Sequence, residues 1–188
     1  MKKTQLIAVA IAALAFAVGA QAQEKQMEMS VYGDISSSKS GGSTTSLGMV
    51  QVQYGKYFTP NIVGKVSYLL AGDMDTNTFT DLGIGARYYF KPAGKAGDIV
   101  PFVGAQLDLT SQRSQSSSTS CLTVAPFTCT TTTTTATSTG SGTGFEGGVA
   151  MFVSESASFD LRGYTQSYTI TGTSTTRTGF NVGLTYRF

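Results

Sequence analysis

The ionisable side chains of this 188-residue chain limit the chemistry that it could perform. The sequence has 11 acidic residues, 13 basic residues and no histidine, which excludes a Ser–His–Asp triad, a Cys–His pair and His-ligated zinc. Carboxylate pairs, such as Asp160 with Glu146 or Asp108, could in principle act as acid and base. We expect them to form ion pairs instead, because arginines share their strand face. We therefore expect no enzymatic activity, no cofactor and no metal site.

A second chemical pattern is the GxGxxG match at residues 142–147. A dinucleotide site needs a strand before this pattern and a helix after it. Here a Thr-rich segment precedes it and an alternating segment follows it. We interpret these glycines as residues of a strand rather than as a phosphate-binding loop.

The only two cysteines lie in a Ser/Thr-rich segment, Thr110 to Thr143, which has 21 serines and threonines among 34 residues. This composition cannot form its own core, so the segment is either mobile or extended as a hairpin. In an exported protein, Cys121 and Cys129 most simply form one disulfide. The ring closed by it would contain the apolar residues Leu122, Val124, Pro126 and Phe127. Either this loop contacts a partner or surface, or it is a variable loop with no partner.

The elements that would position these residues show alternation with a period of two, which is typical of strands with two different faces. The apolar pattern never follows a helical period after Ala22. The alternation predicts an all-β fold of eight strands of about 9–12 residues, the length that a tilted strand needs to cross a bilayer. The alternating segments are residues 27–35, 50–54, 62–70, 82–90, 103–109, 145–153, 159–162 and 180–188.

Short and long connections alternate between these segments, as expected for an antiparallel up-and-down barrel in an outer membrane. An even number of strands places both termini of the chain on the periplasmic side. The short turns are Phe58–Asn61, Lys91–Asp98 and Ser154–Ala157, and the longer polar segments are Ser36–Ser46, Ala71–Phe79, Thr110–Thr143 and Thr169–Thr176. Aromatic residues near the short turns predict a girdle at the membrane boundary: Tyr54, Tyr57, Phe58, Tyr88, Tyr89, Phe90, Phe102, Phe159, Tyr186 and Phe188.

The polar face of the alternating segments carries five acids and four bases. In a membrane barrel these charges would fill a narrow lumen and pair with one another. In a soluble exported barrel that binds a small ligand, the same list would form the outer, solvated face. The residues are Glu28, Asp34, Lys65, Arg87, Asp108, Glu146, Asp160, Arg162 and Arg187.

The first 22 residues have the three parts of a secretory signal peptide. Lys2 and Lys3 precede an apolar core from Leu6 to Val18, and Ala20-Gln21-Ala22 supplies a cleavage site. The core is too short to span a membrane. We predict residues 1–22 as the signal peptide and 23–188 as the barrel domain, which then has 11 basic and 11 acidic residues.

The chain ends on an alternating aromatic and apolar pattern formed by Phe180, Val182, Leu184, Tyr186 and Phe188. This ending resembles the assembly signal of bacterial outer-membrane barrels, and the whole pattern from Glu24 to Phe188 resembles the small OmpX/OmpA-like eight-stranded barrels. The Pro101-Phe102-Val103-Gly104-Ala105 segment is also similar to that superfamily.

The resemblance implies an integral, monomeric protein of the bacterial outer membrane. Its partners would be membrane lipid, lipopolysaccharide, the barrel assembly machinery and a host or surface ligand at the external loops. The implied role is non-enzymatic, in envelope integrity or adhesion. The alternative is a narrow OmpW-like channel for small or apolar molecules. A charged fraction of only 13% argues against nucleic acid as a partner.

Overall fold

The structure, a computed structural model, describes residues 27–40, 43–72, 77–92, 94–121 and 129–188, without the side chains of 34–40, 43–48 and 77. The expected signal peptide and the apolar residues expected inside the disulfide-closed loop, at 122–127, lie outside the described residues. Within the described part, no helix is long and apolar enough to cross a membrane.

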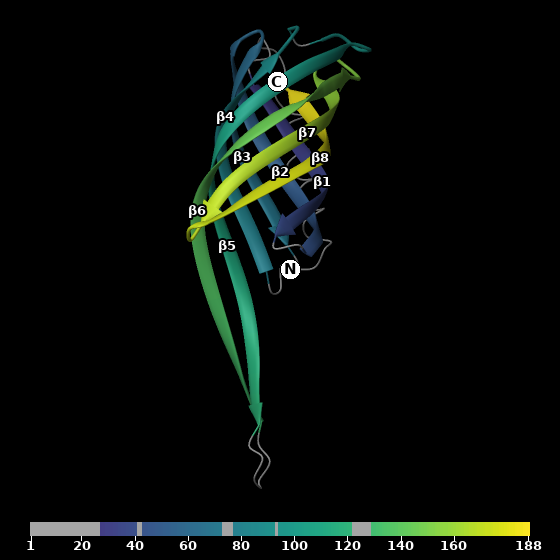
Figure 1. The fold of residues 1–188 in the computed structure, drawn as a ribbon. Helices are drawn as coiled ribbons and strands as arrows, with labels where there is room; N and C mark the ends of the chain where they lie inside the picture. Colours follow the sequence, from purple (N-terminus) through teal and green to yellow (C-terminus); the bar gives the residue numbers. More distant parts are fainter. Residues whose placement is uncertain (1–26, 41–42, 73–76, 93, 122–128) are drawn as a thin grey trace.

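Eight antiparallel strands form a closed barrel in which each strand pairs with its neighbours in the chain and β1 pairs with β8 (Figure 1). The predicted fold is therefore confirmed. The strands are β1 (Met27–Ser40), β2 (Ser43–Thr59), β3 (Ile62–Gly72), β4 (Asn77–Tyr89), β5 (Ile99–Cys121), β6 (Cys129–Phe152), β7 (Ala157–Ile170) and β8 (Thr173–Arg187).

These strands have 11 to 24 residues and are mostly longer than predicted, because polar segments expected as connections continue the ladders. The long connection predicted over Thr169–Thr176 is wrong. A two-residue turn at Thr171 and Gly172, with φ values of 47° and 81°, joins β7 to β8 there. Both residues have positive φ, as a type I′ hairpin turn requires. Threonine favours strands, so a hydroxyl-rich sequence is compatible with a β-ladder.

The first and last described residues, Met27 and Phe188, lie side by side at one rim of the barrel. The Met27 N–H donates to the Phe188 carbonyl, the Phe188 N–H donates to the Met27 carbonyl, and both N···O distances are 3.0 Å. The short β2–β3, β4–β5 and β6–β7 connections belong to this rim. The β5–β6 hairpin extends from the opposite end of the barrel (Figure 1).

The two faces of each strand have opposite character. Along β8, Arg177, Asn181 and Arg187 are buried, whereas Phe180 and Val182 are 73% and 62% exposed. A soluble barrel would bury its apolar face, so this inverted arrangement is that of a transmembrane barrel. The other strands show the same arrangement, and their outward apolar side chains form a belt around the barrel. The belt includes Val66, Leu82, Ile84, Leu107, Leu109, Phe145, Leu161 and Leu184.

The predicted aromatic girdle is partly wrong. Tyr89 and Phe102 are 1% exposed, and Tyr57 is half-buried against them. Tyr89 lies two residues after Arg87 and therefore faces the lumen, as alternation requires. Tyr54, Phe58, Tyr88, Phe90 and Phe159 do face outward. The inward aromatic rings join an apolar cluster in the lumen: Val63, Tyr89, Val100, Phe102, Ala150 and Phe152.

Candidate functional site

The central ion-pair cluster of the lumen forms around Glu146 on β6. Its Oε1 lies 2.6 Å from Lys65 Nζ and 2.9 Å from Arg87 Nε, and its Oε2 accepts a hydrogen bond from Arg162 at 2.7 Å. These partners come from β3, β4 and β7, so one carboxylate joins four strands across the interior. All four side chains are at most 5% exposed.

Glu28 on β1 forms a second group with tyrosines. Tyr57 and Tyr89 donate hydroxyl hydrogen bonds to Glu28 Oε2 at 2.8 and 3.1 Å. Arg87 and Arg187 lie 3.7 and 3.5 Å from the same carboxylate. The Arg87 guanidinium therefore links the Glu146 and Glu28 groups.

Asp160 on β7 is the third buried carboxylate of this network. Tyr32 and Thr185 donate to its Oδ2 at 2.7 Å each, and Ser158 donates to its Oδ1 at 2.8 Å. Arg87 lies 3.7 Å from Oδ2. The oxygens of Asp160 and Glu146 are thus occupied by protein donors and buried, which leaves neither carboxylate the access that an acid–base catalyst needs.

Each of three guanidinium groups in the lumen lies over an aromatic ring. Arg162 lies 4.0 Å from the Tyr32 ring centre, and Arg87 lies 4.3 Å from the Phe102 ring centre. Arg187 lies 4.4 Å from the ring centre of Phe152. Cation–π contacts stabilise each of these charges inside the barrel.

A separate polar group lies nearer the β5–β6 hairpin. The Gln166 side-chain amide donates to both Asp81 and Asp108, and Gln106 donates to Asp108 Oδ1 at 2.6 Å. A void of about 20 Å³ lies between this group and the ion-pair network, lined in part by Gln106, Gln166 and Arg162. That volume holds about one water molecule. The described residues include no cluster of three or more His, Cys, Asp or Glu that could hold a metal ion.

The structure places eight of the nine sequence-predicted lumen charges inside the barrel; the side chain of Asp34 lies outside the described residues. Seven of these eight join the connected network, and Asp108 lies apart from it with Gln166. The sequence reasoning missed Asp81, Gln166 and Arg177, which are 3–4% exposed. Continued period-two alternation identifies all three, but they lie outside the predicted alternating segments. Gln51, Gln53 and Asn181, which the alternation places on the polar face, are also buried, and so is Thr110.

The predicted assembly residues lie along β8, except Phe188, which follows its last residue. Phe180, Val182 and Leu184 face outward, and Tyr186 and Phe188 are half-buried with their rings stacked 6.3 Å apart. Their parity places this apolar row on the lipid-facing side of the strand that closes the barrel onto β1.

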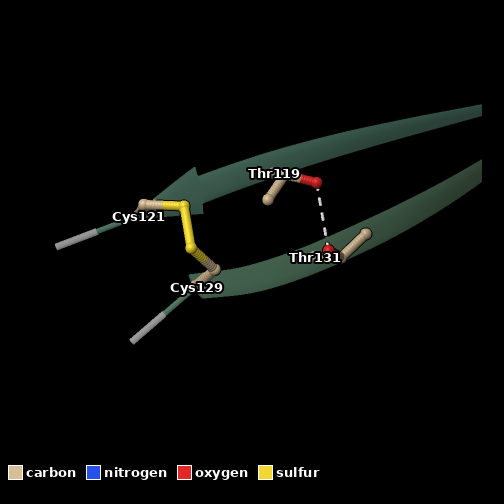
Figure 2. The surroundings of a disulfide bond; sticks show 4 residues. All are labelled: Thr119, Cys121, Cys129 and Thr131. Atoms are coloured by element: carbon tan, nitrogen blue, oxygen red, sulfur yellow. Dashed lines mark hydrogen bonds between the residues drawn. A yellow bond between two sulfur atoms is a disulfide. The ribbon is translucent and has the colours of Figure 1, made fainter. Parts of the chain in front are cut away.

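The outer end of β5 and β6 is a two-stranded hairpin closed by the Cys121–Cys129 disulfide (Figure 2). Thr119 and Thr131 hydroxyls lie 3.0 Å apart beside the disulfide. Every side chain of residues 115–121 and 129–137 is exposed. Of the two states left open for this segment, the structure therefore has the extended hairpin.

The chain matches the family model described as "Outer membrane protein beta-barrel domain" over residues 8–188, and it belongs to that family. Neisserial surface protein A has a TM-score of 0.61 and 16% sequence identity, with 89% of this chain and 100% of that chain covered. Ail, the attachment invasion locus protein of Yersinia pestis, has a TM-score of 0.51 and 8% identity, with 88% and 100% covered. At these identities the likeness concerns the fold. No curated protein sequence matches the chain.

Proposed function

We propose that this chain is a non-enzymatic surface protein of the bacterial outer membrane, with a closed barrel as its anchor and the β5–β6 hairpin as an adhesive element. The observation that supports this proposal is the exposed hairpin. Strand β4 pairs with β5 up to Ser114, and the hairpin continues for seven residues to Cys121. At about 3.4 Å per residue, it extends about 24 Å beyond that pairing.

The filled lumen supports an anchor rather than a channel. Arg87, Arg187 and Phe152 occupy the interior at 3% exposure or less. Moving an ion past these side chains would require breaking buried ion pairs, which is costly. We therefore infer that the OmpW-like channel alternative does not apply. Planar-bilayer recording tests this point, because steady single-channel currents from the purified protein would contradict a closed barrel.

The names of two structural neighbours with the same fold refer to the cell surface or to attachment. The structural relatives include a Neisserial surface protein and an attachment invasion locus protein, and the latter has also been solved with the heparin analogue sucrose octasulfate. In this chain the hairpin carries Arg113 as its only charged residue from 111 to 139. We infer that backbone and hydroxyl groups, rather than charge, mediate its contacts.

The test of adhesion replaces Gln115–Thr135 with an Asn-Gly turn, which the paired ladder can accommodate. We expect this variant to form the same heat-modifiable barrel and to lose binding of expressing cells to host cells, matrix or one another. A matched control substitutes exposed Lys95 by alanine in a short turn at the opposite rim. Unchanged binding after removal of the hairpin would refute its adhesive role.

The route to the membrane is part of the same proposal. Residues 1–22 direct export and are removed, the β8 ending is recognised by the barrel assembly machinery, and the folded barrel is a monomer in contact with lipid and lipopolysaccharide. Mass spectrometry of the outer-membrane fraction tests the first step, since a chain that retains Met1 would contradict cleavage after Ala22.

A further inference from the structure

The outer part of the β5–β6 hairpin is a ribbon with two free edges within the described part of the chain. Strand β5 pairs with β4 only as far as Ser114, and β6 pairs with β7 only from Gly140 onward. Residues 115–121 pair with residues 129–135, and residues 136–139 pair with residues 111–114 of β5. On their other edges, residues 115–121 and 129–139 pair with no further strand among the described residues. A free strand edge presents unpaired N–H and C=O groups.

The register identifies the backbone groups that face the free edges. Cys121 lies opposite Cys129 with a Cα–Cα distance of 4.0 Å, which corresponds to a non-hydrogen-bonded antiparallel pair. Such pairs alternate along a ladder, so the pair Thr119–Thr131 is of the same kind, in agreement with its close hydroxyls in Figure 2. In a non-hydrogen-bonded pair, the N–H and C=O of each residue point away from the partner strand. Thr133, two residues after Thr131, therefore directs its N–H and C=O away from β5 and toward the free edge.

The β6 edge lacks the devices that normally prevent strand pairing. Residues 129–139 contain no charged residue, no proline and no glycine, and the register with β5 has no bulge. Natural edge strands are usually protected by lysine, proline or bulges. The run Thr130–Thr135 is also self-complementary, because an antiparallel copy places threonine opposite threonine in several registers.

We propose that the β6 edge, residues 129–139, pairs antiparallel with the same edge of a second copy of this chain anchored in a facing membrane. The inference rests on the proposed adhesive function and names the partner of the hairpin. Two identical edges related by a two-fold axis form a closed, self-complementary contact.

The direction of β6 requires that the second copy lies in a facing membrane. In one membrane, both β6 strands run toward the barrel, so they could pair only in parallel. An antiparallel pair in one membrane would place β5 of one copy beside β6 of the next. The two copies would then be displaced from each other by only two strand spacings, about 10 Å. Eight strands about 4.8 Å apart enclose a ring wider than about 12 Å even before side chains are added, so the two barrels would collide.

The test uses two populations of lipid vesicles carrying the folded protein and measures their aggregation by light scattering. We expect aggregation when both populations carry the protein and none when one is bare. Thr133→Pro removes an outward N–H without removing a hydrogen bond inside the hairpin, and it should reduce aggregation at least tenfold. The matched control Ser117→Pro removes an equivalent outward N–H from the β5 edge and should leave aggregation unchanged. Gel mobility without boiling shows that both variants fold.

A charge exchange provides a second measurement. Vesicles that both carry Thr133→Lys should aggregate weakly, and mixing them with vesicles that carry Thr133→Glu should restore aggregation. Absence of wild-type aggregation, or equal loss with Ser117→Pro, would overturn pairing through the β6 edge. Aggregation with bare vesicles would also overturn it and would indicate lipid binding instead. The proposed function fails separately, when removal of the hairpin leaves binding to host cells, matrix and other cells unchanged.

Discussion

Replacing Glu146 with glutamine tests whether the ion-pair network holds the barrel together. The substitution preserves the size of the side chain and removes its negative charge. Lys65, Arg87 and Arg162 then keep their charges at distances of 2.6 to 2.9 Å from a neutral amide. All three cations are at most 2% exposed, so water cannot replace the lost carboxylate.

Removing one partner of a buried ion pair costs about 3–5 kcal/mol of unfolding free energy. We expect E146Q to lie within this range, because one carboxylate serves three cations. The assay is equilibrium unfolding in urea of the protein folded into lipid vesicles, followed by the gel shift between folded and unfolded forms. Glu155→Gln, in an exposed turn, is the matched control and should change stability by less than about 1 kcal/mol.

A double variant separates charge from packing. Lys65→Met in the E146Q background removes one of the cations that lost its carboxylate partner and preserves most of the side-chain volume. The double variant should therefore recover more than about 1 kcal/mol of unfolding free energy relative to E146Q alone. If E146Q and E155Q have equal stability, the cluster does not stabilise the fold and the reasoning is refuted.

Three further outcomes follow from the two faces of the barrel and from its ends. Ile84→Arg should cost up to about 2–4 kcal/mol in lipid unfolding experiments, because Ile84 is 63% exposed on the lipid-facing side; an unchanged midpoint would contradict that placement. Gly183→Leu should lower the yield of folded barrel in refolding assays, because a Cβ there would overlap the buried Tyr32 ring; a normal yield would argue against this packing. Cys121→Ser should leave unfolding of the barrel unchanged and increase proteolysis of the hairpin, since the disulfide closes only its outer end; a destabilised barrel would be the opposing result.

Alternation in the sequence was sufficient to predict the strand number, the antiparallel order and the residues that share a face. The reason is local, because successive side chains of any strand point to opposite sides. The same rule placed Lys65, Arg87 and Glu146 together on the polar face. Its limits are the strand ends: Asp81 and Arg177 lie outside the predicted strands, because the polar segments beside them are predicted as connections.

Only the closed barrel decided which polar residues meet. Lys65 and Glu146 are 81 positions apart and touch because β3 and β6 face each other across a narrow interior. Parity alone assigns Tyr89 to the inner face, against its expected place in the girdle, but strand pairing is what brings Phe102 of β5 beside Arg87 of β4. Parity assigns a side chain to a face, but the curvature of the whole sheet determines what that face encloses.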